Sequence, residues 1–398
     1  MRAHADDYRR LHRPSVAQEA VLRHISDCRT AALGGHLEQC DSCEYQRISY
    51  NSCRDRHCPK CQSTARNEWV TQRLQRLLPV PYFHVVFTIP DRLNPLALRN
   101  KEVVFKILFA AVAQTLLAIG RTEKHLGAQI GFTAVLHTWG QNLLFHPHVH
   151  CVVTGGGLSA DGQRWIPSRE NYFLPVKVLG RLFRGKFLAA LEKAYRGGKV
   201  DLAGSTAHLS DPATWRTFRD RLYQLDWIVY AKPPFGGPEH VFRYLGRYTH
   251  RTAISNRRIV DFANGRVTFS WRDYADGCKR KLLTLDAIEF LRRFLLHVLP
   301  KGFVRIRHYG ICASANVNGK LEIARSLLQP RNEEPPPSEE PPRAESPAWW
   351  ERLLHQTGID ALACPCCPAG RMVRQRALSP LELASLANGT EPIVWDTS

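Results

Sequence analysis

The spacing of apolar residues predicts a sheet with a long helix beside it. Residues 82–89 and 130–138 are rich in β-branched and aromatic side chains, which predicts two buried strands. The nearly continuous apolar run at residues 102–119 predicts a helix between them. A further strand, which begins at about residue 146 and runs through 153 into the glycines at 155–157, should follow the turn at 139–142. We therefore expect an antiparallel sheet with the long helix on one face.

The rest of the chain shows further helix and strand patterns, which end before residue 332. Asn264-Gly265 between two apolar runs predicts a β-hairpin. Residues 332–347 are Pro, Glu and Ser without apolar periodicity, which predicts a disordered linker. Further helices are predicted at residues 14–30, 62–78, 177–196, 211–225 and 285–299, and further strands at 227–232, 254–262 and 266–271. Residues 303–310 are predicted to form a basic edge of the same domain.

The charge of the chain indicates a polyanionic partner. Lys and Arg number 55 and Asp and Glu 36 among 398 residues, a formal net charge of +19. In a chain with 44% hydrophobic residues, this excess points first to nucleic acid. The nearest apolar run to a membrane span, residues 103–119, is interrupted by Lys106 and Gln114, and the polar start lacks a signal peptide's apolar core. We expect a cytoplasmic protein that binds no membrane.

Clustered cysteines indicate metal binding in place of disulfides. Cys40-x2-Cys43 and Cys58-x2-Cys61 are separated by 14 residues, the spacing of two knuckles that close one tetrahedral site. We therefore predict structural Zn²⁺ at these four cysteines. Nearby residues that offer ligands for a second zinc are Cys28, His36, Cys53 and His57.

Another Cys-x2-Cys pair, Cys364 and Cys367, lies near the end of the chain and resembles half of a zinc ribbon. Its other half is missing from the tail, so His355 or another chain would have to complete it. Together these features predict an α+β protein in four parts. They are a zinc-binding domain at residues 1–78, a catalytic domain at 79–330, the linker at 331–348 and the tail at 349–398.

A histidine pair is a candidate catalytic metal site. Alternate side chains of a strand share one face, so His148 and His150 point to one side while Val149 points to the other. Imidazole binds several divalent metals, and the glycines at 155–157 let another chain approach closely. The alternative is a polar sheet face without metal.

Two tyrosines are candidate nucleophiles. Tyr244 and Tyr248 follow a predicted helix start near residue 238, so on a helix their phenols share one face. A phenol attacks phosphorus when a metal withdraws charge from the phosphoryl group and a basic neighbour favours the phenolate. The alternative is a pair of rings that packs a helix on a sheet. The basic neighbours are Arg243, Arg247, His250 and Arg251.

In this order, the motifs resemble those of the two-tyrosine HUH rolling-circle transposases of the insertion-sequence-ninety-one family, and the resemblance covers most of the chain. It implies an HUH-type antiparallel sheet, a metal at His148 and His150, and a tyrosine that forms a 5′-phosphotyrosine on single-stranded DNA. The matching stretches are Cys40-Asp41-Ser42-Cys43, Asn51-Ser52-Cys53-Arg54-Asp55-Arg56-His57-Cys58-Pro59-Lys60-Cys61, Phe87-Thr88-Ile89-Pro90, the histidine pair, Tyr244-Leu245-Gly246-Arg247-Tyr248-Thr249-His250-Arg251 and Ala253-Ile254-Ser255-Asn256.

We therefore expect a transposase that nicks and joins single-stranded DNA at transposon ends. His148 and His150 would hold Mg²⁺ or Mn²⁺, Tyr244 or Tyr248 would attack, and Arg247 and Arg251 would stabilise the developing charge. The third metal ligand is expected from His146, Gln141 or His84. Two alternatives stay open, a zinc-dependent DNA-binding regulator without catalysis and a rolling-circle replication initiator.

Overall fold

The computed structural model describes residues 1–61, 69, 73, 75–169, 174–232, 253–274, 276–329, 348, 350–351, 354, 358–388 and 394–396. The chain divides into two compact units, and each is described by itself. The cysteine unit comprises Met1–Arg2, Ala20–Cys61 and Pro330–Ser398, and the histidine unit comprises Ala3–Glu19 and Gln62–Gln329.

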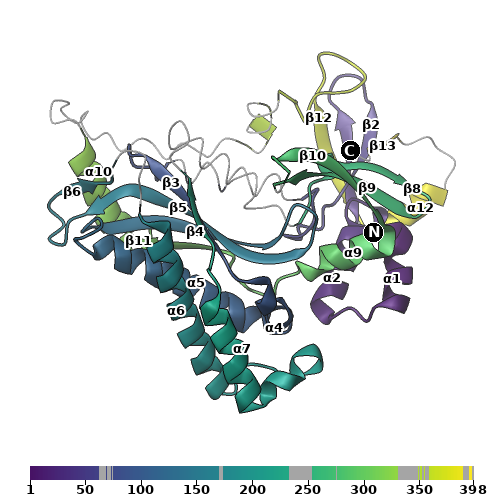
Figure 1. Ribbon diagram of the computed structural model, residues 1–398. Helices are drawn as coiled ribbons and strands as arrows, with labels where there is room; N and C mark the ends of the chain where they lie inside the picture. The colour runs from purple at the N-terminus through teal and green to yellow at the C-terminus, as the bar shows by residue number, and fades with distance from the viewer. Residues whose placement is uncertain are drawn as a thin grey trace. The chain divides into compact units, whose positions relative to one another are not determined.

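An antiparallel sheet forms the centre of the histidine unit, which confirms the predicted α+β class (Figure 1). Among the described residues its strand order is β11-β4-β5-β3-β7, and β6 pairs with β5. The strands are β3 (Tyr82–Thr88), β4 (Gln129–Trp139), β5 (Phe145–Leu158), β6 (Trp165–Pro167), β7 (Val229–Lys232) and β11 (Ile306–Gly310).

Alternation along β5 gives the sheet a dry face and a polar face. Val149, Cys151 and Val153 are buried in the hydrophobic core, whereas His148 and His150 point to the opposite face and are half-buried. Two helices, α5 (Lys101–Arg121) and α6 (Val176–Arg196), pack on each other along the dry face (Figure 1).

Helix α5 is almost wholly apolar because it is the core helix of this unit. By length and composition it is the one described helix that could cross a membrane, with a mean hydropathy of 2.1. However, 67% of that apolar window is buried inside the protein. Its composition is therefore accounted for by packing against the sheet and α6.

A second, three-stranded sheet of the histidine unit contains the predicted hairpin. Asn264 and Gly265 have φ of 50° and 69°, the left-handed values that a two-residue hairpin turn requires. Helix α7 is capped at its start, since Oδ2 of Asp211 accepts a 2.7 Å hydrogen bond from the Thr214 amide. The elements are β8 (Ile259–Ala263), β9 (Arg266–Asp273), β10 (Lys279–Asp286), α4 (Asn94–Arg99), α7 (Pro212–Gln224), α9 (Ala287–Leu296) and α10 (Glu322–Leu328).

A sheet in the cysteine unit joins the two ends of the chain, with strand order β12-β1-β2-β13 among the described residues. The prediction of a separate C-terminal tail is therefore wrong. The physical reason is that β1 and β12 pair in antiparallel fashion from Gly35–Leu378 to Cys40–Met372. The strands are β1 (Gly35–Cys40), β2 (Gln46–Tyr50), β12 (Met372–Leu378) and β13 (Val394–Asp396), and helix α12 is Pro380–Asn388.

The structure also describes several other short elements. They are α1 (Ala5–Leu11), α2 (Val16–Asp27), the 3₁₀ helices η1 (Arg2–His4), η2 (Ala31–Leu33), η3 (Asp91–Leu93), η4 (Gly204–Ser210), η5 (Asn256–Arg258) and η6 (Ser314–Asn316), and the π-helix η7 (Val317–Leu321). The predicted tyrosine helix, the predicted linker and most of the predicted helix at 62–78 lie outside the described residues.

Candidate metal centres

Three imidazoles converge on the polar face of the sheet. His137 on β4 lies directly opposite His148 on β5, and His150 follows on the same face of β5. One ring nitrogen of each histidine lies within 4.8 Å of those of the other two. His137 is buried and stacks on Trp139, with ring centroids 4.7 Å apart. The arrangement can hold one divalent metal ion.

Hydrogen bonds orient the two histidines that the sequence predicted. Nδ1 of His148 lies 2.6 Å from the carbonyl oxygen of His146, so this nitrogen donates and Nε2 stays available to a metal. Nδ1 of His150 lies 2.7 Å from Nε2 of His84. If His150 donates here, its Nε2 is also left for the metal. Metal-binding histidines are commonly oriented in this way through their other nitrogen.

The site favours neutral imidazoles. Burial, with a smaller contribution from His146, lowers the pKa of His148 to about 3. Burial also lowers the pKa of His84 to about 4 and that of His150 well below its usual value. A histidine must be neutral to bind a metal, so these pKa values suit the ligand role near neutral pH.

The third histidine of the group is one that the sequence reasoning missed. We expected His146, Gln141 or His84, in that order, to complete the metal site. His146 and Gln141 line the cavity over the histidines, and His84 contacts His150, but the residue that joins the group is His137. The available signal was its place in the adjacent predicted strand, but the residue that it faces depends on the register between the two strands.

A cavity of about 830 Å³ lies over the three histidines. Beyond the histidines its lining includes Asp91, Asn94, Tyr274 and Arg292. Tyr274 is 63% exposed, so a phenol from the described part of the chain reaches this cavity. The predicted catalytic residues Tyr244, Tyr248, Arg247 and Arg251 lie outside the described residues.

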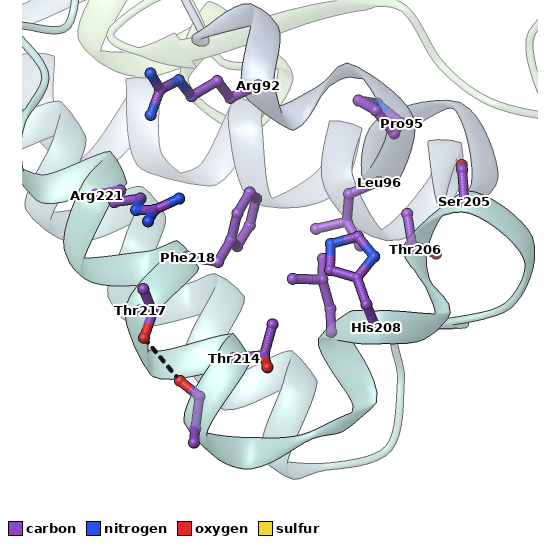
Figure 2. Close-up of a pocket in the computed structure, with 12 residues that line it drawn as sticks. Arg92, Pro95, Leu96, Ser205, Thr206, His208, Thr214, Thr217, Phe218 and Arg221 are labelled. Atoms are coloured by element: carbon purple, nitrogen blue, oxygen red, sulfur yellow. Dashed lines mark hydrogen bonds between the residues drawn. The ribbon is translucent and has the colours of Figure 1, made fainter.

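A second cavity of about 680 Å³ lies between η3, α4, η4 and α7 (Figure 2). Arg92 and Arg221 lie near one end of it, beside the half-buried ring of Phe218. The helix η3 contributes Asp91 to the histidine cavity and Arg92 to this one, so the two cavities flank the same short helix. The sequence reasoning predicted α7 but not this cavity.

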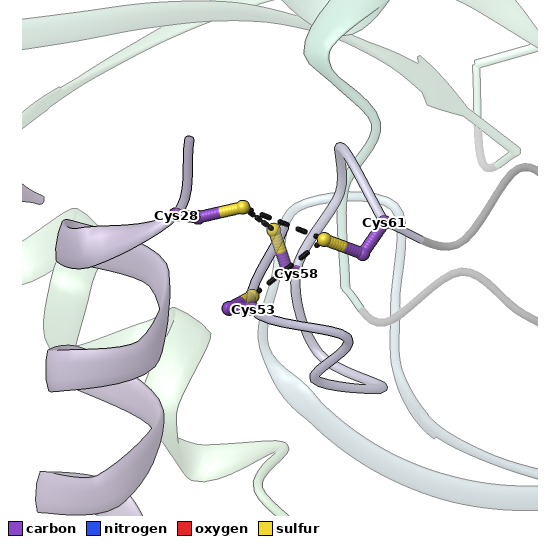
Figure 3. A group of neighbouring side chains, drawn as sticks. All are labelled: Cys28, Cys53, Cys58 and Cys61. Atoms are coloured by element: carbon purple, nitrogen blue, oxygen red, sulfur yellow. Dashed lines mark hydrogen bonds between the residues drawn. The ribbon is translucent and has the colours of Figure 1, made fainter. Parts of the chain in front are cut away.

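Four cysteines converge in the cysteine unit (Figure 3). Sγ of Cys28 lies 3.4 Å from Sγ of Cys61 and 3.6 Å from that of Cys58, and Sγ of Cys53 lies 3.6 Å from that of Cys61. A disulfide would need about 2.05 Å, whereas tetrahedral zinc with bonds of about 2.3 Å separates its sulfurs by about 3.8 Å. The group therefore fits zinc.

The predicted pairing of the cysteines is wrong. We expected Cys40 and Cys43 to share one zinc with Cys58 and Cys61, but the second pair faces Cys28 and Cys53. The reason is that Cys40 ends strand β1 and Cys43 follows it, and the partner strand β12 brings other cysteines to them.

Two predicted alternatives for a second zinc are engaged elsewhere. Nε2 of His36 lies 3.3 Å from Oε1 of Glu38, and Nδ1 of His57 lies 2.9 Å from Oδ1 of Asp55. Neither histidine joins a cysteine group among the described residues. Of the predicted second set, Cys28 and Cys53 alone are brought together with other candidate ligands.

Comparisons with known proteins agree with this architecture. Residues 1–89 match the family described as transposase zinc-binding domain, and residues 131–320 match the family described as putative transposase. Together with the cysteine groups, the first match supports bound Zn²⁺.

Two curated relatives are transposases. The putative transposase y4qJ of Sinorhizobium fredii (strain NBRC 101917 / NGR234) is 49% identical over 398 residues, 100% of this chain and 97% of that protein. The transposase for insertion sequence element IS801 of Pseudomonas savastanoi pv. phaseolicola is 29% identical over 75% of this chain and 71% of its own length.

A solved structure of the conjugative relaxase TrwC with oriT DNA aligns with 42% of this chain and 71% of its own at 16% identity. Its TM-score of 0.23 is too low to support any argument. The curated relatives and the two family matches decide the assignment. The chain belongs to the insertion-sequence-ninety-one family of transposases with an N-terminal zinc-binding domain.

Proposed function

We propose that this transposase nicks and rejoins single-stranded DNA at transposon ends through a tyrosine nucleophile, in rolling-circle transposition. The observation that carries the proposal is the convergence of His137, His148 and His150 at the base of a cavity on the polar face of the sheet. The formal charge of +19 supports a DNA partner. Membership of a transposase family favours this function over a regulator without catalysis or a replication initiator.

The histidine group fits a divalent metal because all three donors are nitrogens held in place by the sheet. Imidazole ligands suit the later first-row metals best, whereas Mg²⁺ and Mn²⁺ prefer oxygen ligands, which water and the DNA phosphate would supply beside the three histidines. When bound, such an ion withdraws charge from a phosphoryl group and orients it. His137, His148 and His150 are the residues that would hold it.

The path of the chain supports a role for the tyrosine segment. Strand β7 ends at Lys232, which lies opposite His84 on β3, and β3 is the neighbour of the histidine strand β5. Neighbouring strands are about 4.8 Å apart, so the chain leaves the sheet about 10 Å from β5. The residues that follow include Tyr244 and Tyr248.

The chemistry proposed for the tyrosines balances without a cofactor that carries energy. A phenolate oxygen attacks the phosphorus, the bond to the 3′ oxygen breaks, and the leaving oxygen takes a proton to become a 3′-hydroxyl. The 5′-phosphotyrosine keeps the bond energy, so a later 3′-hydroxyl can reverse the step and join a new strand. We assign the first cleavage to Tyr244, transfer to Tyr248, and charge stabilisation to Arg247 and Arg251.

The test uses two variants with tyrosine-to-phenylalanine changes, because phenylalanine keeps the ring and removes only the nucleophilic oxygen. Y244F combined with Y248F should form no covalent adduct with labelled single-stranded transposon-end DNA and should keep the wild-type melting temperature. Y274F is the matched control, since Tyr274 lines the histidine cavity and is exposed. Mass spectrometry of the adduct peptide identifies the attacking residue.

Two outcomes would end the proposal in its present form. An adduct that persists in the double variant would exclude both tyrosines. Loss of the adduct in Y274F alone would move the nucleophile to Tyr274, within the described cavity.

A further inference from the structure

Cysteines from distant parts of the chain form a second four-sulfur group in the cysteine unit. Cys40 ends β1 and Cys43 follows it, while Cys364 and Cys367 precede β12. The antiparallel pairing of β1 with β12 ends at Cys40 opposite Met372, so the two Cys-x2-Cys turns meet at one end of this strand pair. The ligand atoms of all four lie within 4.8 Å of one another.

The distances in this group suit a metal and not a disulfide. Sγ of Cys40 lies 3.6 Å from Sγ of Cys367, and Sγ of Cys43 lies 3.6 Å from Sγ of Cys364. These separations are far longer than the S–S bond of about 2.05 Å in a disulfide. They lie close to the value of about 3.8 Å between sulfurs around tetrahedral zinc with bonds of about 2.3 Å.

The two turns have the same backbone arrangement. The amide of Ser42 donates to Sγ of Cys40 over 3.4 Å, and the amide of Cys366 donates to Sγ of Cys364 over 3.3 Å. In each turn the donor lies two residues after the first cysteine. Amide donors of this kind stabilise a thiolate, which is the form of cysteine that binds zinc.

The residues beside the sulfurs also leave space for them and hold the two turns together. A Cβ atom at Gly370 would collide with the sulfurs of Cys40 and Cys367, so this position accepts only glycine. The amide of Arg371 donates to Oδ1 of Asp41 over 2.8 Å and ties the two turns together. The two Cys-x2-Cys turns therefore form a single preorganised site.

We propose that this group binds a second structural Zn²⁺, which fastens the C-terminal segment to the N-terminal strands. The zinc-binding module of this transposase is then made from both ends of the chain. The match to the transposase zinc-binding family ends at residue 89 and so contains only one half of the ligands of this site. The inference does not depend on the proposed DNA chemistry.

Zinc content tests the proposal on the full-length protein. The wild type should contain two zinc ions per chain, and the double variant C364S/C367S should contain one. The matched control is C366S, because Cys366 lies between the two ligands and is exposed but does not join the group. It should keep both ions. C53S/C61S should also lose one ion, from the other site. A single zinc in the wild type, or two in C364S/C367S, would overturn the proposal.

A second measurement tests the proposed zinc site even if C364S/C367S does not fold. Cys43 and Cys366 are both exposed, so simple accessibility predicts equal alkylation by iodoacetamide. If Cys43 binds zinc, it should react about tenfold more slowly than Cys366 in the zinc-loaded wild type, and the difference should vanish after chelation. Peptide mass spectrometry reads both rates from one sample. Equal rates before chelation would refute the site.

Discussion

The histidine centre and the cysteine centres of this transposase are assembled in different ways. The three histidines lie on two adjacent strands, and the hydrogen bonds between β4 and β5 fix their positions. By contrast, Cys40, Cys43, Cys364 and Cys367, here called the split cysteine group, come from distant parts of the sequence. Its two facing sulfur pairs join cysteines that are separated by 321 and by 327 positions. The histidine centre is thus a property of one hairpin, and the split cysteine group is a property of the whole chain.

This difference indicates what a bound metal would contribute at each centre. The sheet under the histidines is held by its own ladder and by the core of α5 and α6, so the site exists before a metal binds. The cysteine unit has small core clusters, one of which consists largely of cysteine side chains. In such a unit, metal binding supplies folding free energy directly. Loss of metal should therefore abolish activity in one centre and structure in the other.

The largest expected effect is loss of cleavage in His148→Ala. Removing a ligand forfeits several kcal/mol of charge stabilisation, so cleavage of single-stranded DNA should slow by roughly 10³-fold or more. The thermal melting temperature should change little, because His148 is half-buried on a formed sheet. Cleavage kinetics and calorimetry measure the two effects on the same protein.

His125→Ala is the control for His148→Ala, since His125 lies in the turn between α5 and β4 and does not line the histidine cavity. It should cleave like the wild type. If His148→Ala melts as early as C364S/C367S or C53S/C61S does, the distinction between the two kinds of centre fails. Wild-type cleavage in the presence of EDTA would remove the metal from the mechanism altogether.

Local patterns predicted the histidine strand well. Period-two alternation placed His148 and His150 on one face, and in the structure these two form one group with His137, which was not predicted. The sequence did not reveal His137, because its partner depends on the register between β4 and β5. That register shifts between His137 and Trp139, at the turn that joins the two strands. Spacing rules do not report such a shift.

Long-range pairing explains why the cysteine sites were predicted only in part. The two Cys-x2-Cys pairs at 40–43 and 58–61 satisfy the local rule for one site, and nothing nearby contradicts it. The structure separates them because β1, near the start of the sequence, pairs with β12, near its end. A half-ribbon at Cys364–Cys367 was visible in the sequence, but its partner could be identified only from strand pairing.

A smaller effect should come from His84, which positions a ligand without belonging to the group. Its Nε2 lies 2.7 Å from Nδ1 of His150. Loss of such a partner commonly costs 10- to 100-fold in metal affinity, so His84→Ala should weaken Mn²⁺ binding by about that factor. Titration calorimetry with Mn²⁺ measures it. Cleavage at saturating Mn²⁺ should recover most of the wild-type rate.

The conservative variant His84→Gln separates positioning from packing, because a glutamine oxygen can still accept the proton of His150. It should restore most of the Mn²⁺ affinity. Equal Mn²⁺ affinity in the wild type and His84→Ala would contradict this prediction. It would show that the sheet alone orients His150, without the hydrogen bond to His84.

The smallest effect is expected at the cavity beside η3, a site of the histidine unit that needs no metal. Arg92 and Arg221 are exposed there beside the Phe218 ring. If DNA binds as proposed, we expect these two arginines to contact the phosphates of a strand that extends from the histidine cavity. Each lost phosphate contact should lower the salt dependence of single-strand binding by about 0.7 in log–log slope. R92A/R221A should therefore bind DNA a few-fold more weakly and show a slope lower by about 1.4, whereas R92K/R221K keeps the charge and should keep the slope. Fluorescence anisotropy across a salt series gives both values.

An unchanged slope in the alanine variant would place the DNA path elsewhere on the unit. An unchanged cleavage rate at saturating DNA would confirm that these arginines bind the strand without taking part in the chemistry.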